Sequence, residues 1–173
     1  MHVTEIRQAL DGMQMIVDTR EQDTVRLRRR IQQFGCPVER QALIAGDYSA
    51  RFPLPGGEWF DLSDKVSIER KMNIDELCGC FTRERKRFER EFERAKEKGM
   101  RIYLLVENAS WELMYAQNYK SKMTPQALIS SILVWGIRYD CHYIFCREFT
   151  SGKLIKDILY REGKERLERI ADT

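Results

Sequence analysis

Two short apolar runs, each next to a segment with helical periodicity, set the fold class of this chain. Met13–Thr19 (MQMIVDT) and Arg101–Glu107 (RIYLLVE) have the length of strands and are apolar on both faces. Thr24–Phe34 and Arg83–Lys98 carry apolar residues at intervals of three and four, which is typical of helices that cover a sheet. The sequence therefore predicts an α/β fold with a central mixed sheet flanked by helices.

The remaining segments continue this alternation. Val38–Ile44 and Asp47–Phe52 are expected to form a hairpin or a bent pair of strands. Further strands are predicted at Trp59–Lys71, with an interruption near Ser63, and at Cys141–Cys146. Start and stop residues predict four more helices, at Ile74–Cys80, Ser110–Tyr115, Thr124 onward, and Ser151–Ile170 with a break near Gly163. No linker divides the chain, so residues 1–150 are expected to form one domain and residues 151–173 a helical appendage of it.

Charge and cysteine content exclude several classes of protein. The 30 basic and 27 acidic residues give a net charge of +3, so nucleic-acid binding would depend on local clustering. No apolar stretch is long enough to cross a membrane and the N-terminus is no signal peptide. We expect a cytoplasmic, nucleoid-associated protein, or a nuclear one if the source is eukaryotic. The five cysteines lack a CxxC pair, and most are expected to be reduced core residues and not zinc ligands.

Three acids and a lysine occur within or at the ends of these strands. Asp18 ends the first apolar run, Asp47 follows Gly46, and Glu69 and Lys71 share one face of a third strand. Converging carboxylates bind a hard divalent cation, which activates water against a phosphate. A nearby lysine can orient or deprotonate that water, or neutralise developing charge. Spacing alone leaves open a second interpretation, in which Glu69 and Lys71 form an exposed ion pair.

The order of these residues resembles the signature of the XPF-type structure-specific endonucleases. The resemblance extends over roughly residues 13 to 110, in the family's order. The matching segments are Val17–Glu21, Gly46-Asp47, Glu69-Arg70-Lys71, Asp75, Arg87 and Tyr103–Glu107. One residue departs from the pattern, since Lys86 stands where the family usually has glycine.

The resemblance implies a restriction-endonuclease-like core that cuts branched or flapped DNA with Mg²⁺ or Mn²⁺. It implies that Asp47 and Glu69 bind the metal together with the backbone carbonyl of Arg70. Asp18 would support the metal site, and Lys71 would be the catalytic lysine. The residues expected to complete the site or to hold DNA and neighbouring side chains are Arg70, Asp75, Arg20 and Arg87.

Two roles stay open at this point. Glu21 is expected either to orient Arg20 or to lie at the surface as an ordinary acid. Many family members carry a helix-hairpin-helix or a helicase domain, and we expect this protein to act without either. Its grip on DNA is then expected from this domain, from a homodimer or heterodimer partner, or from another protein.

Basic residues cluster in two places. Arg83–Lys98 holds eight basic and five acidic residues, a surplus of three, and Arg26–Arg30 forms a second cluster. Such faces pair with DNA phosphates, or they are simply solvated. The candidate DNA contacts are Arg83, Arg87, Arg90 and Arg28. The apolar helix from Thr124, with Trp135, is expected in the core, with a subunit interface as the alternative.

Two classes of function other than catalysis are compatible with the same residues. An inactive domain of this family would bind DNA junctions without cutting them. A scaffold would stabilise a catalytic partner. The intact set of Asp47, Glu69 and Lys71 favours the enzyme, because neither of the other classes needs these residues together.

Overall fold

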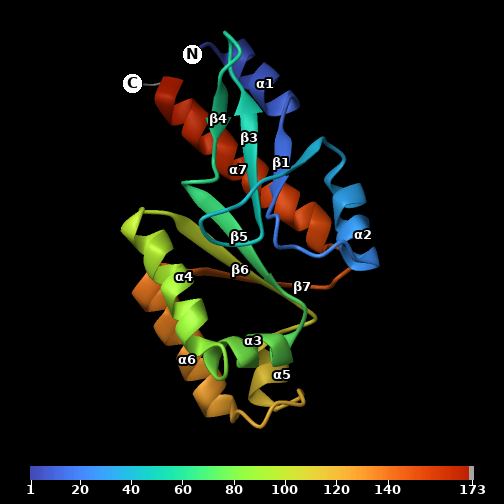
Figure 1. Cartoon of the computed structure of the whole chain (residues 1–173), viewed down its shortest axis with the longest axis vertical. Coiled ribbons are helices and arrows are strands. Elements are labelled where there is room, and N and C mark those ends of the chain that lie inside the picture. Colours follow the sequence, from blue (N-terminus) through green and yellow to red (C-terminus); the bar gives the residue numbers. More distant parts are fainter. Residues whose placement is uncertain (172–173) are drawn as a thin grey trace.

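Seven strands form one mixed sheet in the computed structural model, which describes residues 1–171 (Figure 1). The strands are β1 (Gln14–Val17), β2 (Val38–Arg40), β3 (Tyr48–Pro53), β4 (Trp59–Asp61), β5 (Val66–Lys71), β6 (Arg101–Glu107) and β7 (His142–Cys146). Their order is β2-β1-β3-β5-β6-β7, with β4 paired to β3. β5, β6 and β7 are parallel, whereas β3 runs antiparallel to β1 and β5. The predicted mixed sheet is confirmed.

Helices cover both faces of this sheet. They are α1 (Val3–Asp11), α2 (Val25–Phe34), α3 (Ile74–Phe81), α4 (Arg85–Glu97), α5 (Trp111–Tyr115), α6 (Pro125–Tyr139) and α7 (Ser151–Ala171). One face packs α3, α4 and α6 through residues such as Phe88, Phe92 and Trp135. The other packs α1, α2 and α7 through residues such as Leu27 and Leu159. The predicted α/β layers are therefore confirmed.

The capping residues begin these helices as the sequence predicted. The side chains of Thr24, Ser110 and Thr124 each accept a hydrogen bond from a backbone N–H of the first turn. Helix α2 ends at Gly35, whose φ of 61° closes the last turn. Helix α1 was not anticipated from the sequence, and it packs Ile6 and Leu10 into the core.

The expected pairing of the second and third strands, as a hairpin or a bent pair, is wrong. β2 pairs in parallel with β1, with Met15 opposite Val38. This pairing is possible because α2 returns the chain to the N-terminal end of β1 before β2 begins. The loop at residues 41–47 then crosses the end of β1 and places β3 on its other side. This crossing brings Asp47 beside the end of β1.

The expected break near Gly163 is also wrong, since α7 runs without interruption from Ser151 to Ala171. A Cβ atom on Gly163 would lie 2.2 Å from the Phe52 ring, so glycine allows the helix to approach the sheet. Ile155 and Leu159 of α7 lie in the same core cluster as β-strand residues. The last two residues of the expected appendage, 172 and 173, lie outside the described residues.

Helix α6 divides its apolar residues between core and surface. Leu128, Ile132 and Trp135 are buried, which confirms the core interpretation for this side. Leu133 and Ile137 on the outer side are exposed, and the expected dimer remains a prediction. No helix within residues 1–171 combines the length and hydrophobicity needed to span a membrane. All five cysteines are free thiols, and three of them are buried.

Candidate active site

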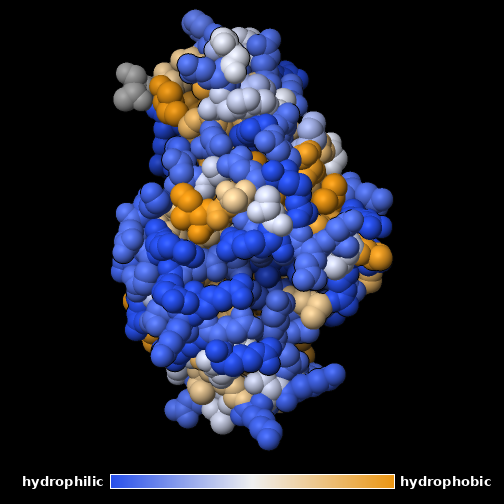
Figure 2. All heavy atoms as spheres, viewed as in Figure 1, coloured by the Kyte–Doolittle hydropathy of each residue, from blue (hydrophilic) through white to orange (hydrophobic). Residues whose placement is uncertain are grey.

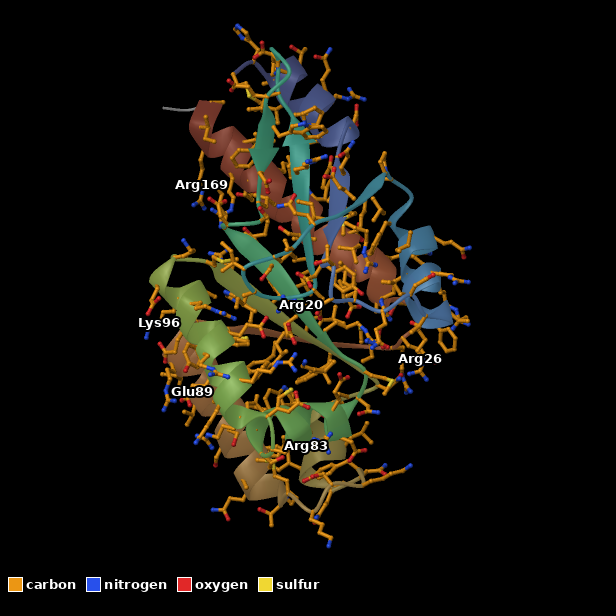
Figure 3. The ribbon with its side chains drawn as sticks, viewed as in Figure 1. Arg20, Arg26, Arg83, Glu89, Lys96 and Arg169 are labelled. Carbon is orange, nitrogen blue, oxygen red and sulfur yellow. The ribbon has the colours of Figure 1, made fainter. Side chains whose placement is uncertain are left out.

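The backbone of three strands brings the predicted acids to one edge of the sheet. The N–H of Asp18 donates to the carbonyl of Asp47 at 2.8 Å, and the N–H of Asp47 donates to the carbonyl of Ile68 at 2.8 Å. The end of β1, the start of β3 and the end of β5 are thereby adjacent. This edge lies near the centre of the view in Figure 3, where Arg20 is labelled. Residues that are 29 and 22 positions apart in sequence meet because β3 is antiparallel to both neighbours.

Gly46 sets the position of Asp47. Its φ of 78° lies in the left-handed region, which favours glycine. A Cβ atom here would lie 2.7 Å from the Ser67 hydroxyl oxygen, so only glycine lets this turn pack directly on β5. Its N–H donates to Glu91 Oε1 at 3.0 Å, which ties the turn to α4.

Asp47, Glu69 and Lys71 form the centre of the site. Asp47 Oδ2 accepts a hydrogen bond from the Arg70 N–H at 2.7 Å, and Lys71 Nζ donates to Glu69 Oε1 at 2.5 Å. The Glu69 and Lys71 side chains are only 8% and 13% exposed, so the interpretation as an exposed ion pair is wrong. Lys71 Nζ also lies 5.5 Å from the centre of the Phe88 ring. A buried charged group with these partners is costly to maintain, which is typical of functional sites.

The electrostatics of these groups follow from their crowding. Desolvation raises the pKa of Asp47 well above its ordinary value, and the charge of Glu69 raises it further. Desolvation also raises the pKa of Glu69, although the charge of Lys71 opposes this shift. Burial would lower the pKa of Lys71, but the charge of Glu69 outweighs it and the pKa lies above its ordinary range. Lys71 is therefore held as a cation.

Asp18 lies at the same edge but has other partners. Its carboxylate accepts hydrogen bonds from the Arg20 N–H and side chain and from the Leu43 N–H, and these use both oxygens. Burial alone would raise the pKa of Asp18, but the Arg20 and Leu43 hydrogen bonds outweigh it, so the pKa is lowered. Asp18 thus holds Arg20 and the 41–47 loop in place next to Asp47.

The donor set fits a small hard cation with two carboxylate ligands. Within residues 1–171 no group of three His, Cys, Asp or Glu side chains is close enough to form a metal site. The hydrogen bonds of Asp47 and Glu69 use one oxygen of each carboxylate. The other oxygen of each could bind a cation, which would offset the repulsion that raises the pKa of Asp47. Mg²⁺ often binds through one or two carboxylates while it keeps several waters.

Two of the predicted site residues make their contacts elsewhere. The Arg70 side chain lies 3.4 Å from Glu107 Oε1, beneath the site, and only its backbone contacts Asp47. Asp75 accepts hydrogen bonds from the N–H groups of Lys120 and Ser121, so it fixes the loop before α6. Within the described chain neither side chain forms a hydrogen bond to the three central residues.

The predicted DNA contacts are all exposed. Arg83 and Arg87 lie near Glu84 at the start of α4, at 3.8 and 4.0 Å, and Arg90 lies on the outer side of that helix. Arg28 pairs with Asp23 at 2.8 Å on α2. Figure 2 shows that this face of the molecule is mostly hydrophilic, and Figure 3 places Arg83 at the foot of α4 and Arg20 at the centre.

Sequence reasoning missed Glu91 as part of the site. Its carboxylate accepts a hydrogen bond from the Gly46 N–H. Burial raises the pKa of Glu69, the charge of Lys71 opposes that shift, and the charge of Glu91 adds to it. A signal existed, because Glu91 interrupts the apolar stripe of Phe88 and Phe92 on the inner side of α4. An acid at a core-facing position is rarely tolerated without a partner.

Sequence reasoning also missed Arg30, a buried residue of α2 that contacts residues beneath the site. Arg30 lies 3.5 Å from Glu107 and donates to the Tyr48 hydroxyl at 3.0 Å. That hydroxyl donates to Glu21 at 3.0 Å, so Glu21 faces Tyr48 and does not orient Arg20. An arginine among the basic residues of α2 gives no sequence signal of burial, and only the packing of α2 on the sheet shows it.

Known proteins share both the sequence pattern and this fold. A family model, the ERCC4 domain, matches residues 17–156. XPF from Aeropyrum pernix aligns with a TM-score of 0.61 and 17% identity, covering 86% of this chain and 61% of that chain. A structure described as XPF from Aeropyrum pernix in complex with DNA gives the same TM-score and identity, covering 88% of this chain and 66% of that one. This chain thus spans less than two thirds of either structure.

No curated protein sequence matches the chain. At 17% identity the structural likeness shows the fold, a restriction-endonuclease-like core. The family model covers well over half of the chain and includes the segments from Asp18 to Glu107 that carry the resemblance. The chain therefore belongs to the ERCC4-domain family, the family of the XPF-type structure-specific endonucleases.

Proposed function

We propose that this chain is a divalent-metal-dependent endodeoxyribonuclease that hydrolyses phosphodiester bonds in branched or flapped DNA. The observation that carries the proposal is the group of Asp47, Glu69 and Lys71 at one end of the central strands, in which Glu69 is buried and the other two residues are partly buried, in a member of the ERCC4-domain family. The match to a structure of XPF in complex with DNA supports DNA as the ligand.

Each central residue would have a distinct task. Asp47 and Glu69 would hold Mg²⁺ or Mn²⁺, which when bound polarises the phosphate and makes a bound water more acidic. Lys71, held as a cation by Glu69, would neutralise charge that develops on the phosphate. Its raised pKa favours this role over that of a general base.

Other residues would position the substrate or the central groups. Arg20, fixed by Asp18 and partly exposed, would bind a phosphate next to the site. The exposed arginines of α4 would contact the DNA backbone farther away, without reading sequence. Asp18 and Glu91 would act as positioning residues, because they hold the 41–47 loop and the Gly46 turn.

Substitution of Lys71 by alanine separates chemistry from binding. Lys71→Ala removes a group that acts mainly on the transition state, so we expect cleavage to fall by at least about 100-fold. DNA affinity should stay within a few-fold, because the lysine is buried and contacts Glu69. Cleavage of labelled fork, flap and junction DNA with Mn²⁺ measures the first quantity, and fluorescence anisotropy without metal measures the second.

Lys65→Ala is the matched control, because Lys65 lies just before the opposite end of β5, where it pairs with Asp64 and lies near the Phe60 ring. It should cleave like the wild type. Glu69→Ala should also lose cleavage, and high Mn²⁺ should restore part of it, whereas Lys71→Ala should gain nothing. Near-normal cleavage by Lys71→Ala would refute the mechanism. A wild-type protein that binds every branched DNA and cuts none would instead favour a junction-binding module.

A further inference from the structure

An exposed aromatic ring lies at the same edge of the sheet as Asp18, Asp47 and Glu69. Phe149 follows β7, and its side chain is 65% exposed. Because β5, β6 and β7 are parallel and adjacent, the loop after β7 and the end of β5 lie at one edge. Two strand spacings separate them, about 10 Å, which is roughly the axial length of three stacked nucleotides.

The loop that carries Phe149 is held from two sides. The backbone carbonyl of Phe149 accepts a hydrogen bond from Gln33 Nε2 of α2 at 2.6 Å. The Oε1 of the same Gln33 side chain accepts a hydrogen bond from the Gly152 N–H of α7 at 3.0 Å. Within the loop, the N–H and hydroxyl of Thr150 both donate to the carbonyl of Arg147 at 3.1 Å. The ring is thus presented on a fixed turn, and little conformational entropy is lost when a flat ligand stacks on it.

Two arginines without a salt-bridge partner in the described chain accompany the ring, one near it in space and one near it in sequence. The Arg29 guanidinium lies 5.9 Å from the ring centre, and Arg147, two residues before Phe149 in the sequence, is exposed. Neither arginine forms a salt bridge within residues 1–171. Arg26 contacts both the Phe149 loop and the strand that carries Lys71. Its guanidinium contacts the sulfur of Met72, the residue after Lys71, and lies 4.0 Å from Glu148, the residue before Phe149. Figure 3 shows Arg26 at the foot of α2, beside this edge.

We propose that Phe149, with Arg29 and Arg147, binds one unpaired nucleobase of the substrate DNA and its phosphates, next to the cleavage site. An aromatic face beside unpaired arginines is the combination that binds single-stranded DNA, because every base can stack and every nucleotide carries a phosphate. A duplex offers no free base face, so this place would favour DNA with an unpaired arm. The inference rests on the proposed nuclease function.

Binding of a fork and of a blunt duplex, compared without metal, tests the inference. Phe149→Ala should weaken fork binding by about 5- to 150-fold, the range for loss of one base–aromatic stack. Duplex binding should change by less than about twofold, and Phe149→Trp should restore fork binding. A 2-aminopurine base in the unpaired arm should be quenched on binding to the wild type and to Phe149→Trp, and not on binding to Phe149→Ala.

Trp59→Ala is the matched control, because Trp59 is also an exposed aromatic beside an arginine but pairs with Pro53 at the opposite end of β3. It should bind both DNAs like the wild type. If the wild type cuts forks and Phe149→Ala binds them equally well, this inference is refuted and the nuclease stands. If the wild type binds no DNA, both fall. If the wild type binds forks in a way that depends on Phe149 but cuts none of them, only the proposed nuclease function is refuted.

Discussion

Replacing Glu107 by glutamine tests whether a buried ion network supports the site. The Glu107 carboxylate is 1% exposed and lies 3.5 Å from Arg30 and 3.4 Å from Arg70. Both arginines are also largely buried, at 5% and 11%. Glutamine keeps the shape of the side chain and one acceptor oxygen, but it removes the charge that the two guanidinium groups share.

The expected cost can be worked from these distances. At an effective dielectric constant of about 20, each pair contributes about 5 kcal/mol of attraction before desolvation is counted. Removing one partner of a buried ion pair costs about 3–5 kcal/mol, because the other charge stays buried. Glu21 lies 3.8 Å from Arg30 and offsets part of this loss. We therefore expect the lower end, about 3 kcal/mol of unfolding free energy.

Urea unfolding at neutral pH, followed by circular dichroism, measures this quantity. The midpoint should fall while the m-value stays unchanged, since the substitution alters stability and not the surface exposed on unfolding. Glu97→Gln serves as the control, because Glu97 is exposed on α4 and forms no salt bridge within residues 1–171; it should change stability by less than about 0.5 kcal/mol. A loss below about 1 kcal/mol for Glu107→Gln would show that the two arginines do not depend on this charge.

Two further substitutions probe positions outside the central group. Glu91→Gln keeps an acceptor for the Gly46 N–H but removes a charge beside Glu69, so Mn²⁺ affinity measured by calorimetry should fall about tenfold without loss of fold; an unchanged affinity would limit Glu91 to holding the turn. Burial would raise the pKa of Glu162, but hydrogen bonds, first from Tyr103, lower it below its ordinary 4.5. Its contribution is present above pH 4.5 and is lost as the pH falls through the lowered pKa. Glu162→Gln should therefore cost about 1–3 kcal/mol at pH 7 and progressively less below pH 4.5 in urea unfolding.

The sequence by itself determined the layers of this fold and the identity of the central residues. Apolar runs of strand length predicted β1 and β6, and capping residues predicted where α2, α5 and α6 begin. The period of two placed Glu69 and Lys71 on one face, and the structure confirms that they touch. These features depend on neighbours within a few positions, which is why local patterns reveal them.

Only the tertiary structure decided which strands are neighbours and where each polar side chain finds its partner. A period of two gives the face of a strand but not its partner, so the parallel pairing of β1 with β2 was missed. The placement of Asp47 between Asp18 and β5 depends on that strand order. Asp75 faces the loop before α6, and Arg30 is buried against Glu107, because these contacts join residues 45 and 77 positions apart. Such pairings are set by packing of the whole chain, which no local pattern records.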